Sequence, residues 1–174
     1  GSHHVDLLRT LLGEPRSVLG SVRIEQPLRG PTADDPRSLR ATADDAFTIL
    51  LEWEGGAHAV LDISASSPYR WERFEVHGSD AALRWDESGY ALWRIVAGHE
   101  PEAVEIPTHL QLEPRSGDPA LVAPFGVLVD RLHRAIAHHE PMSPDFDDAV
   151  AVQRVLDAAR ASSAAGTRMH VDVP

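Results

Sequence analysis

Between residues 46 and 106 the chain changes repeatedly from extended segments to short turns, and this alternation constrains the fold more than any other feature. From residue 46 to residue 53, large apolar side chains alternate with other residues, which predicts a strand with one buried face. Gly55 and Gly56 then turn the chain into a second strand, expected over residues 58 to 65. Further extended segments are expected at 73 to 77, 82 to 85, 90 to 97 and 104 to 106. Because parallel neighbours need a crossover of about a dozen residues or more, these short connections predict an antiparallel meander.

Segments with helical spacing of apolar residues flank these strands. One helix is expected over residues 4 to 12, a second around 121 to 136, and a third around 149 to 159 that ends at Gly166. Residues 169 to 173 are expected to form a last strand. This order predicts an α+β fold, in which helices pack on one face of a mostly antiparallel, open-faced sheet.

The stretch from residue 26 to residue 44 separates the first extended segment from the meander. It contains three prolines, a glycine and interspersed aspartates and arginines, which are typical of loops. We therefore expect a long loop here, and loops of this length are often functional or mobile.

If helices cover only one face of the sheet, the opposite face is either solvated or used for association. Large aromatic side chains in the strand region are candidates for such a contact: Trp53, Trp71, Trp85, Tyr90 and Trp93. The alternative is that most of these rings lie in the core beneath the helices.

The composition excludes several partners and chemistries. A formal net charge of -11 opposes attraction to nucleic acid and to anionic lipid, so neither partner is expected. The absence of cysteine excludes disulfides and thiolate chemistry. Because the start of the sequence also lacks the apolar segment of a secretory signal, we expect a cytoplasmic location. All sixteen basic residues are arginine, so no lysine of this chain acts as a general acid.

Two motifs near the ends of the chain can be compared with known families. Gly1, His3, Asp6 and Leu7 follow the pattern Gly-any-His-any-any-Asp-Leu, and residues 145 to 166 combine Phe-any-Asp, an apolar run and Ala-any-any-Ser. Both resemble the Gfo/Idh/MocA family (glucose-fructose oxidoreductase/inositol dehydrogenase) of NAD(P)-dependent enzymes. With glycines where the family carries hairpin glycines, the likeness spans nearly the whole chain.

The resemblance implies that residues 1–174 form a single C-terminal substrate-binding and oligomerisation domain, without the N-terminal Rossmann domain that binds NAD or NADP. The sequence indeed contains no Gly-any-Gly-any-any-Gly motif. The intact enzyme would act on a hydroxyl group of a sugar, inositol or related polyol. We expect the chain alone to be inactive, to bind no cofactor or metal, and to form a homo-oligomer through its open sheet face.

His3 is the candidate catalytic residue implied by the resemblance, because the family's histidine shuttles the hydroxyl proton as hydride leaves the substrate. Imidazole suits this task because it gains and loses protons near neutral pH. The family's paired aspartate would precede Gly1, outside this chain. Gly-Ser-His is also what some cleaved purification tags leave behind, and that origin would remove His3 from the catalytic list.

Tyr69, Arg70 and Trp71 are the candidate substrate-binding residues. They follow the second hairpin strand, where relatives often place groups that contact the polyol or sugar. A phenol, a guanidinium and an indole suit a hydroxylated ligand through hydrogen bonds and ring stacking. The alternative is an exposed loop with an aromatic ring against the sheet edge.

Two rival functions belong to other classes. The chain could be a free-standing binding or assembly module that uses the same sheet without catalysis. It could also be an unrelated α+β enzyme that uses His3, or that binds a metal through His58, Asp62 and His77.

Overall fold

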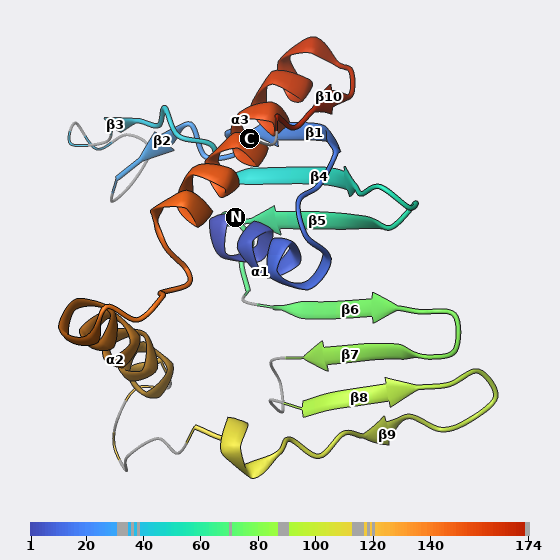
Figure 1. The fold of residues 1–174 in the computed structure, drawn as a ribbon. Helices are drawn as coiled ribbons and strands as arrows, with labels where there is room; N and C mark the ends of the chain where they lie inside the picture. Colours follow the sequence, from blue (N-terminus) through green and yellow to red (C-terminus); the bar gives the residue numbers. More distant parts are fainter. Residues whose placement is uncertain are drawn as a thin grey trace. The chain divides into compact units, whose positions relative to one another are not determined.

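The chain folds into two compact units, each described here by itself: Gly1–Ser67 with Ser143–Pro174, and Pro68–Met142 (Figure 1). The structure is a computed structural model that describes residues 1–30, 35, 37, 39–69, 71–86, 91–112, 117, 119 and 121–172. The described residues form α-helices and antiparallel sheets, so the predicted α+β fold class is confirmed.

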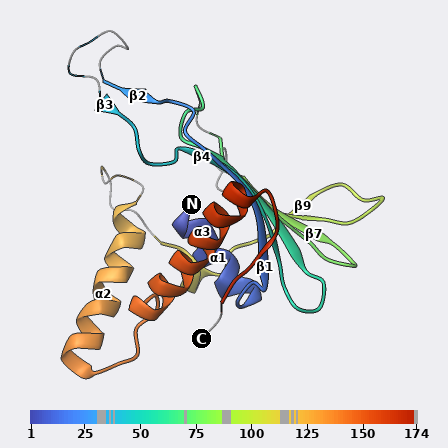
Figure 2. The ribbon, with the colours of Figure 1, turned by 90° about the horizontal axis from the view of Figure 1, so that it is seen from above.

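The first unit is a four-stranded antiparallel sheet covered by two helices. The helices are α1 (Ser2–Leu12) and α3 (Phe146–Ala165), close to their predicted positions. The strands are β1 (Ser17–Arg23), β4 (Ala46–Glu52), β5 (His58–Ser64) and β10 (Met169–His170), in the order β10-β1-β4-β5. Both helices lie on the same face of this sheet, as Figure 2 shows, which confirms the expected one-sided packing for this unit.

The predicted alternation along β4 places its large side chains beneath the helices. Ile49 and Leu51 are 1% and 0% exposed. Trp53 continues this face, is 5% exposed and donates its Nε1–H to the Gly13 carbonyl at 2.8 Å. The core interpretation is therefore correct for Trp53. The remaining core of the unit comes mainly from both helices and the neighbouring strands: Val5, Leu8, Val18, Leu61, Val152, Val155 and Ala159.

α3 approaches the sheet most closely at Gly20 of β1. A Cβ atom at Gly20 would lie 2.9 Å from the Ala159 carbonyl oxygen and 3.3 Å from the Ile49 side chain. Real Cβ atoms do not come this close to backbone oxygens, so only glycine lets the helix pack directly on this strand.

Serine hydroxyl groups of α3 accept hydrogen bonds along the edge of β1 that β10 leaves unpaired. β10 pairs only with Ser17 and Val18, so it does not reach the later residues of β1. There the N–H of Gly20 donates to Ser162 Oγ and that of Val22 to Ser163 Oγ, both at 2.9 Å. The end of α3 thus supplies acceptors that a longer β10 would otherwise provide.

The predicted loop from residue 26 to residue 44 contains a short two-stranded ribbon that local sequence did not reveal. β2 (Leu28–Arg29) pairs with β3 (Leu39–Arg40) in antiparallel fashion. Asp45, whose side chain is 1% exposed, holds the base of this ribbon. Its carboxylate accepts hydrogen bonds from the backbone N–H groups of Glu25 (2.6 Å) and Gln26 (3.0 Å) and from Arg29 (2.9 Å). The Glu25 N–H contributes most to lowering the pKa of Asp45 below its usual range.

The second unit contains a separate antiparallel meander. Its strands are β6 (Arg73–His77), β7 (Ala82–Asp86), β8 (Ala91–Ile95) and β9 (Glu102–Ala103), paired in chain order. The strand predicted at 104 to 106 is wrong, because β9 ends at Ala103 and only the N–H of Val104 continues the pairing, to Leu92. A 3-10 turn, η1 (Thr108–Leu110), and the helix α2 (Val122–His138) follow.

The other aromatic side chains differ in position. The register pairs Trp85 with Leu92 and Trp93 with Arg84, which puts the two indoles on opposite faces of the second sheet. Trp71 precedes β6 and is exposed, whereas Tyr90 lies outside the described residues. The aromatic residues therefore do not gather on one open face, contrary to that expectation.

Candidate functional site

His3 lies in the first turn of α1, and its side chain is exposed. The helix begins at Gly1, whose carbonyl accepts a hydrogen bond from the Val5 N–H at 3.1 Å. Gly1 packs against the ring of Phe47, because a Cβ atom added to Gly1 would come 2.8 Å from that ring. α1 therefore starts above the beginning of β4, and His3 is displayed at that end of the sheet.

The two faces of α1 explain why His3 stays accessible. Val5 and Leu8 point into the core and are 0% and 6% exposed. Leu7 and Leu11 follow His3 at four-residue intervals and are exposed, so all three lie on the outward face of the helix. The sequence thus buries one side of α1 and leaves the imidazole on the other.

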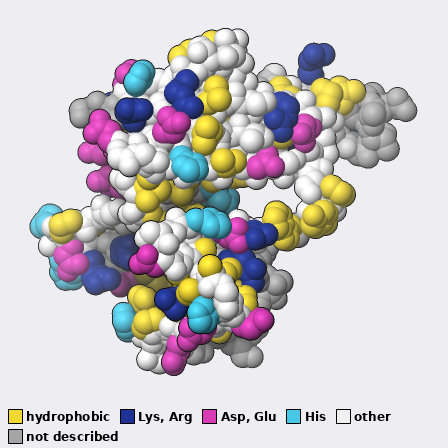
Figure 3. Space-filling view, turned by 90° about the vertical axis from the view of Figure 1, so that its right-hand side faces the viewer, with side chains coloured by type: hydrophobic (Ala, Val, Ile, Leu, Met, Phe, Trp, Pro, Cys, Tyr) yellow, Lys and Arg dark blue, Asp and Glu magenta, His cyan; other side chains and the backbone are white. Residues whose placement is uncertain are grey.

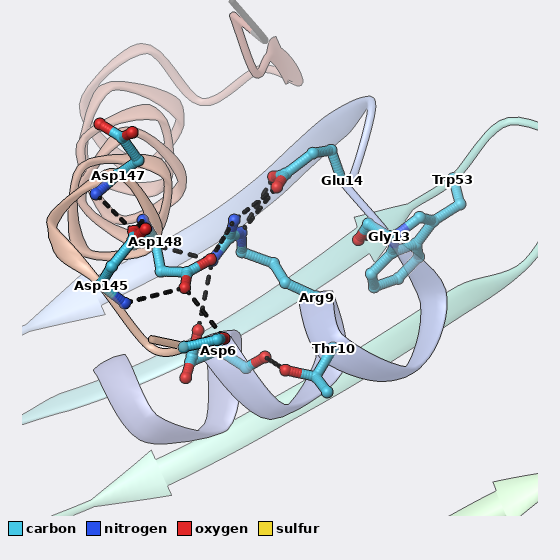
Figure 4. A network of polar contacts seen from close by, with 10 residues as sticks. Asp6, Arg9, Thr10, Gly13, Glu14, Trp53, Asp145, Asp147 and Asp148 are labelled. Atoms are coloured by element: carbon cyan, nitrogen blue, oxygen red, sulfur yellow. Dashed lines mark hydrogen bonds and ion pairs between the residues drawn. The ribbon is translucent and has the colours of Figure 1, made fainter. Parts of the chain in front are cut away.

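Arg9 fastens α1 to the beginning of α3 (Figure 4). Its side chain is only 9% exposed and binds the carboxylates of Glu14, of Asp6 (3.2 Å) and of Asp148 (3.5 Å). Nη1 also donates to the backbone carbonyl of Asp148 at 3.2 Å. Because one guanidinium joins three parts of the unit, the helix that carries His3 is held in a defined position. We did not predict this contact, for which the only local signal is acidic residues three positions before and five after Arg9.

The acidic start of α3 caps the helix. Asp145 accepts hydrogen bonds from the N–H groups of Asp147 and Asp148, at 2.8 Å and 3.0 Å. In return Asp148 accepts from the Asp145 N–H at 3.0 Å, which completes a capping box. This backbone hydrogen bond is the main cause of the lowered pKa of Asp148, and Ser143 and Arg9 add to it. The carboxylate that receives Arg9 therefore stays ionised.

A polar cluster lies where β5 ends. Glu25 accepts hydrogen bonds from the hydroxyl groups of Ser66 and Ser64, the latter at 3.0 Å. Ser66 contributes most to lowering the pKa of Glu25. The Ala65 N–H donates to the Asp45 carbonyl at 2.7 Å. These contacts fix the exit of β5, which leads toward the predicted substrate-binding segment.

The predicted substrate-binding residues lie at the start of the second unit, whereas His3 belongs to the first. Tyr69 and Trp71 are 68% and 66% exposed, so both side chains are accessible to a ligand. Arg70 lies outside the described residues. The structure therefore does not bring His3 together with these residues within one unit.

The residues of the alternative metal site are divided between the two units, with His58 and Asp62 in the first and His77 in the second. His58 and Asp62 lie on the open face of β5, and Asp62 accepts a hydrogen bond from Thr48 Oγ1 at 2.7 Å. His77, on β6, lies 3.6 Å from Glu75. Among the described residues, no three His, Asp or Glu side chains form a group that could hold a metal ion.

A hollow of about 480 Å³ lies in the second unit beside β8 and β9, and neither Tyr69 nor Trp71 lines it. Charged groups of both signs line it, including Arg94, Glu100 and Glu102. On the face drawn in Figure 3, acidic and basic side chains are likewise interspersed. No helix within the described residues is both long and apolar enough to cross a membrane.

His3 is thus an accessible imidazole in the first turn of a helix that Arg9 holds in place. It can accept a proton from a hydroxyl group or return one. Residues 1–172 match the family model described as "Oxidoreductase family, C-terminal alpha/beta domain", the Gfo/Idh/MocA family.

The chain belongs to this family. No curated protein sequence matches this Gfo/Idh/MocA domain, but many solved structures do. A levoglucosan dehydrogenase in complex with NADH and levoglucosan has a TM-score of 0.80 at 21% identity, with 99% of this chain and 49% of that chain covered. An oxidoreductase domain protein from Kribbella flavida has a TM-score of 0.78 at 26% identity, with the same coverage.

A third similar structure is an Agrobacterium radiobacter oxidoreductase in complex with NAD+, L-tartaric acid and magnesium. Its TM-score is 0.71 at 18% identity, with 98% of this chain and 47% of that chain covered. The Gfo/Idh/MocA domain thus spans about half the length of these proteins.

Proposed function

We propose that this domain is the substrate-binding and oligomerisation part of an NAD-dependent oxidoreductase that acts on a hydroxyl group of a sugar, inositol or related polyol. The observation that carries the proposal is the position of His3. The family's histidine pattern falls on an exposed imidazole, and the helix that presents it is fixed through Arg9. The domain spans about half of its structural relatives, so the rest of the enzyme would lie in another part of the protein.

The part of the chain that the structure describes does not fit a dinucleotide site. Such sites are built on parallel βαβ units with a glycine-rich turn at a helix N-terminus. The sheets of the described residues are antiparallel, and the sequence has no Gly-any-Gly-any-any-Gly motif. We therefore assign the binding of NAD, or of NADP, to a separate nucleotide-binding half, which would accept or return the hydride.

His3 would transfer the proton of the reaction, as a general base or general acid. When the hydroxyl carbon is oxidised to a carbonyl, the hydroxyl group must lose its proton, and a neutral imidazole can take it. In the reverse direction the protonated imidazole returns that proton to the carbonyl oxygen. The exposed position of His3 on α1 permits a substrate to approach it directly.

The accessible side chains and the ligands of the relatives support the proposed substrate class. Tyr69 and Trp71 are exposed, and a phenol and an indole suit a hydroxylated ligand. The related structures contain levoglucosan, L-sorbose and L-tartaric acid, all of which carry hydroxyl groups. We propose that Tyr69, Arg70 and Trp71 contact the substrate of this domain.

Reading the coding DNA upstream of the Gly1 codon tests this function first. We expect an open frame of about 120 to 150 residues, as for one nucleotide-binding domain, with a glycine-rich strand-to-helix turn. The protein made from the whole frame should reduce NAD or NADP with at least one member of a sugar and polyol panel. The 174-residue chain alone should not reduce NAD or NADP with any of these substrates. A start codon directly before the Gly1 codon, or turnover by the 174 residues alone, would contradict the proposal.

The open face of the first sheet is the surface we propose for self-association. Leu19, Leu50 and Val60 are paired across β1, β4 and β5, on the face opposite the helices. Val60 is 64% exposed and Leu19 is 39% exposed. An apolar row across three strands is a suitable centre for an interface between copies. On this basis we propose a homo-oligomer.

Val60→Asp should weaken this self-association. A carboxylate in this row would have to be buried in the interface without a partner, so we expect a shift from oligomer to the 19.0 kDa monomer. Light scattering coupled to size-exclusion chromatography measures the change. Leu39→Asp is the matched control, because Leu39 is 74% exposed but lies on the short ribbon β2–β3. Equal masses for both variants and the unchanged protein would show that this face does not mediate association.

A further inference from the structure

The first turn of α1, which carries His3, has little local support of its own. Its N-cap residue, Gly1, offers no side chain to the free N–H groups, and the sequence Ser-His-His-Val that follows contains no acidic residue. A helix as short as the 11 residues of α1 is also marginally stable by itself. The position of His3 therefore depends on contacts between α1 and the rest of the first unit.

Arg9 makes such a contact with the beginning of α3 (Figure 4). Its Nη1 donates to Asp6 Oδ1 and to the Asp148 carbonyl oxygen, both at 3.2 Å, and its Nη2 lies 3.5 Å from Asp148 Oδ1. Asp6 lies three residues after His3, and all four residues belong to the first unit. The guanidinium therefore joins the helical turn next to His3 to the first turn of α3.

The beginning of α3 is itself fixed. The Asp148 carboxylate accepts hydrogen bonds from the Asp145 N–H at 3.0 Å and from Ser143 Oγ at 3.2 Å. Further along the helix, Val152 and Val155 are 7% and 0% exposed, so α3 is anchored in the core. This helix therefore offers α1 a defined point of attachment.

Arg9 also separates carboxylates that would otherwise repel each other. Asp6 of α1 and Asp148 of α3 bind the same guanidinium, and their side chains are only 33% and 30% exposed. Like charges that are close together and partly removed from water repel more strongly than charges in bulk solvent. Without Arg9, this repulsion would push the beginning of α1 away from α3 and would displace His3.

We propose that Arg9, with Asp148 as its partner, is a positioning residue for proton transfer by His3. It would hold the first turn of α1 so that the imidazole meets the substrate hydroxyl group at hydrogen-bond distance. This inference rests on the proposed function, because it requires His3 to transfer the proton. Arg9 itself touches no reacting atom and acts only through His3.

Steady-state kinetics of the intact oxidoreductase test this role. Arg9→Met should lower kcat about 10-fold to 100-fold, since a displacement of about 1 Å can cost 100-fold, and should leave KM nearly unchanged. Arg9→Lys should recover part of the loss, because it keeps the charge but not the planar fork. Arg168→Met is the matched control. Arg168 bridges Glu52 and the Ser17 hydroxyl group, so this variant loses a similar bridge and should keep its kcat.

A double-mutant cycle distinguishes positioning from a general loss of structure. If Arg9 acts through His3, Arg9→Met should lower kcat by less than about a further twofold when His3 is already alanine. A merely structural role would lower kcat by the same factor in both backgrounds, and that result would overturn the inference. Thermal unfolding of each variant shows whether the fold is retained.

Asp148→Asn tests the same contact if Arg9→Met does not fold. Asparagine keeps an oxygen for the Asp145 N–H but loses the charge that binds Arg9, so kcat should fall, and this fall should vanish in the His3→Ala background.

The outcomes separate this inference from the proposed function. If His3→Ala lowers kcat but the Arg9 and Asp148 variants do not, the inference is wrong and the function stands. If His3→Ala leaves turnover unchanged, the proposed proton transfer fails, and the inference fails with it.

Discussion

Replacing His3 by alanine in the intact oxidoreductase is expected to lower the turnover number about 100-fold to 10,000-fold, the usual contribution of a positioned general acid or base. His3 is exposed, so its loss should leave the fold unchanged. Because the substrate would still be bound by other groups, KM should change far less than kcat. Steady-state kinetics with NAD and the best substrate of the panel measure both constants.

Two further measurements separate proton transfer from a structural role of His3. Added imidazole should restore part of the activity of His3→Ala, because a small base can enter the space left by the side chain. His99→Ala, which removes an exposed histidine from the turn before β9, should retain full activity. Unchanged turnover in His3→Ala would remove His3 from the mechanism. A loss that imidazole does not rescue, accompanied by lower stability, would indicate a structural role instead.

The parts of the fold that the sequence predicts are those with local signals. Alternation along residues 46 to 53 revealed β4, and the glycine pair at 55 and 56 revealed the turn into β5, because side-chain period and turn chemistry are properties of neighbouring residues. Gly166 marked the end of α3 for the same reason, with a φ of 65° that favours glycine. The ribbon β2–β3 was missed because two-residue strands are too short to show a period.

Contacts between distant residues left no such signal. Arg9 and Asp148 are 139 residues apart, and neither neighbourhood indicates that one binds the other. For the site, the family pattern placed His3 on α1, and the structure adds the reason for its exposure, which is the burial of Val5 and Leu8 on the other side. The proposed roles of Tyr69, Arg70 and Trp71 stay predictions, since they depend on a substrate.

Ser162→Ala is expected to lower the free energy of unfolding of the first unit by about 2 to 4 kcal/mol. Ser162 is 0% exposed, and its hydroxyl group accepts from the Gly20 N–H at 2.9 Å and donates to the Thr167 carbonyl at 2.6 Å. Alanine removes the hydroxyl group and leaves the Gly20 N–H and the Thr167 carbonyl without their hydrogen bonds. Each buried group left unsatisfied costs about 1 to 3 kcal/mol. Water does not easily replace the hydroxyl group, because Ser162 is fully buried. Native-state hydrogen exchange of the β1 amides measures the loss where it occurs.

A graded series makes this prediction specific. Ser163→Ala removes a single acceptor, that of the Val22 N–H at 2.9 Å, so it should cost about 1 kcal/mol. Ser79→Ala, at an exposed turn of the second unit, should stay within about 0.5 kcal/mol of the unchanged protein. If all three variants protect the β1 amides equally, the serines at the end of α3 do not stabilise this strand. If the graded order is found, the family's Ala-any-any-Ser pattern has a physical basis: it supplies hydroxyl groups to the strand that β10 is too short to cover.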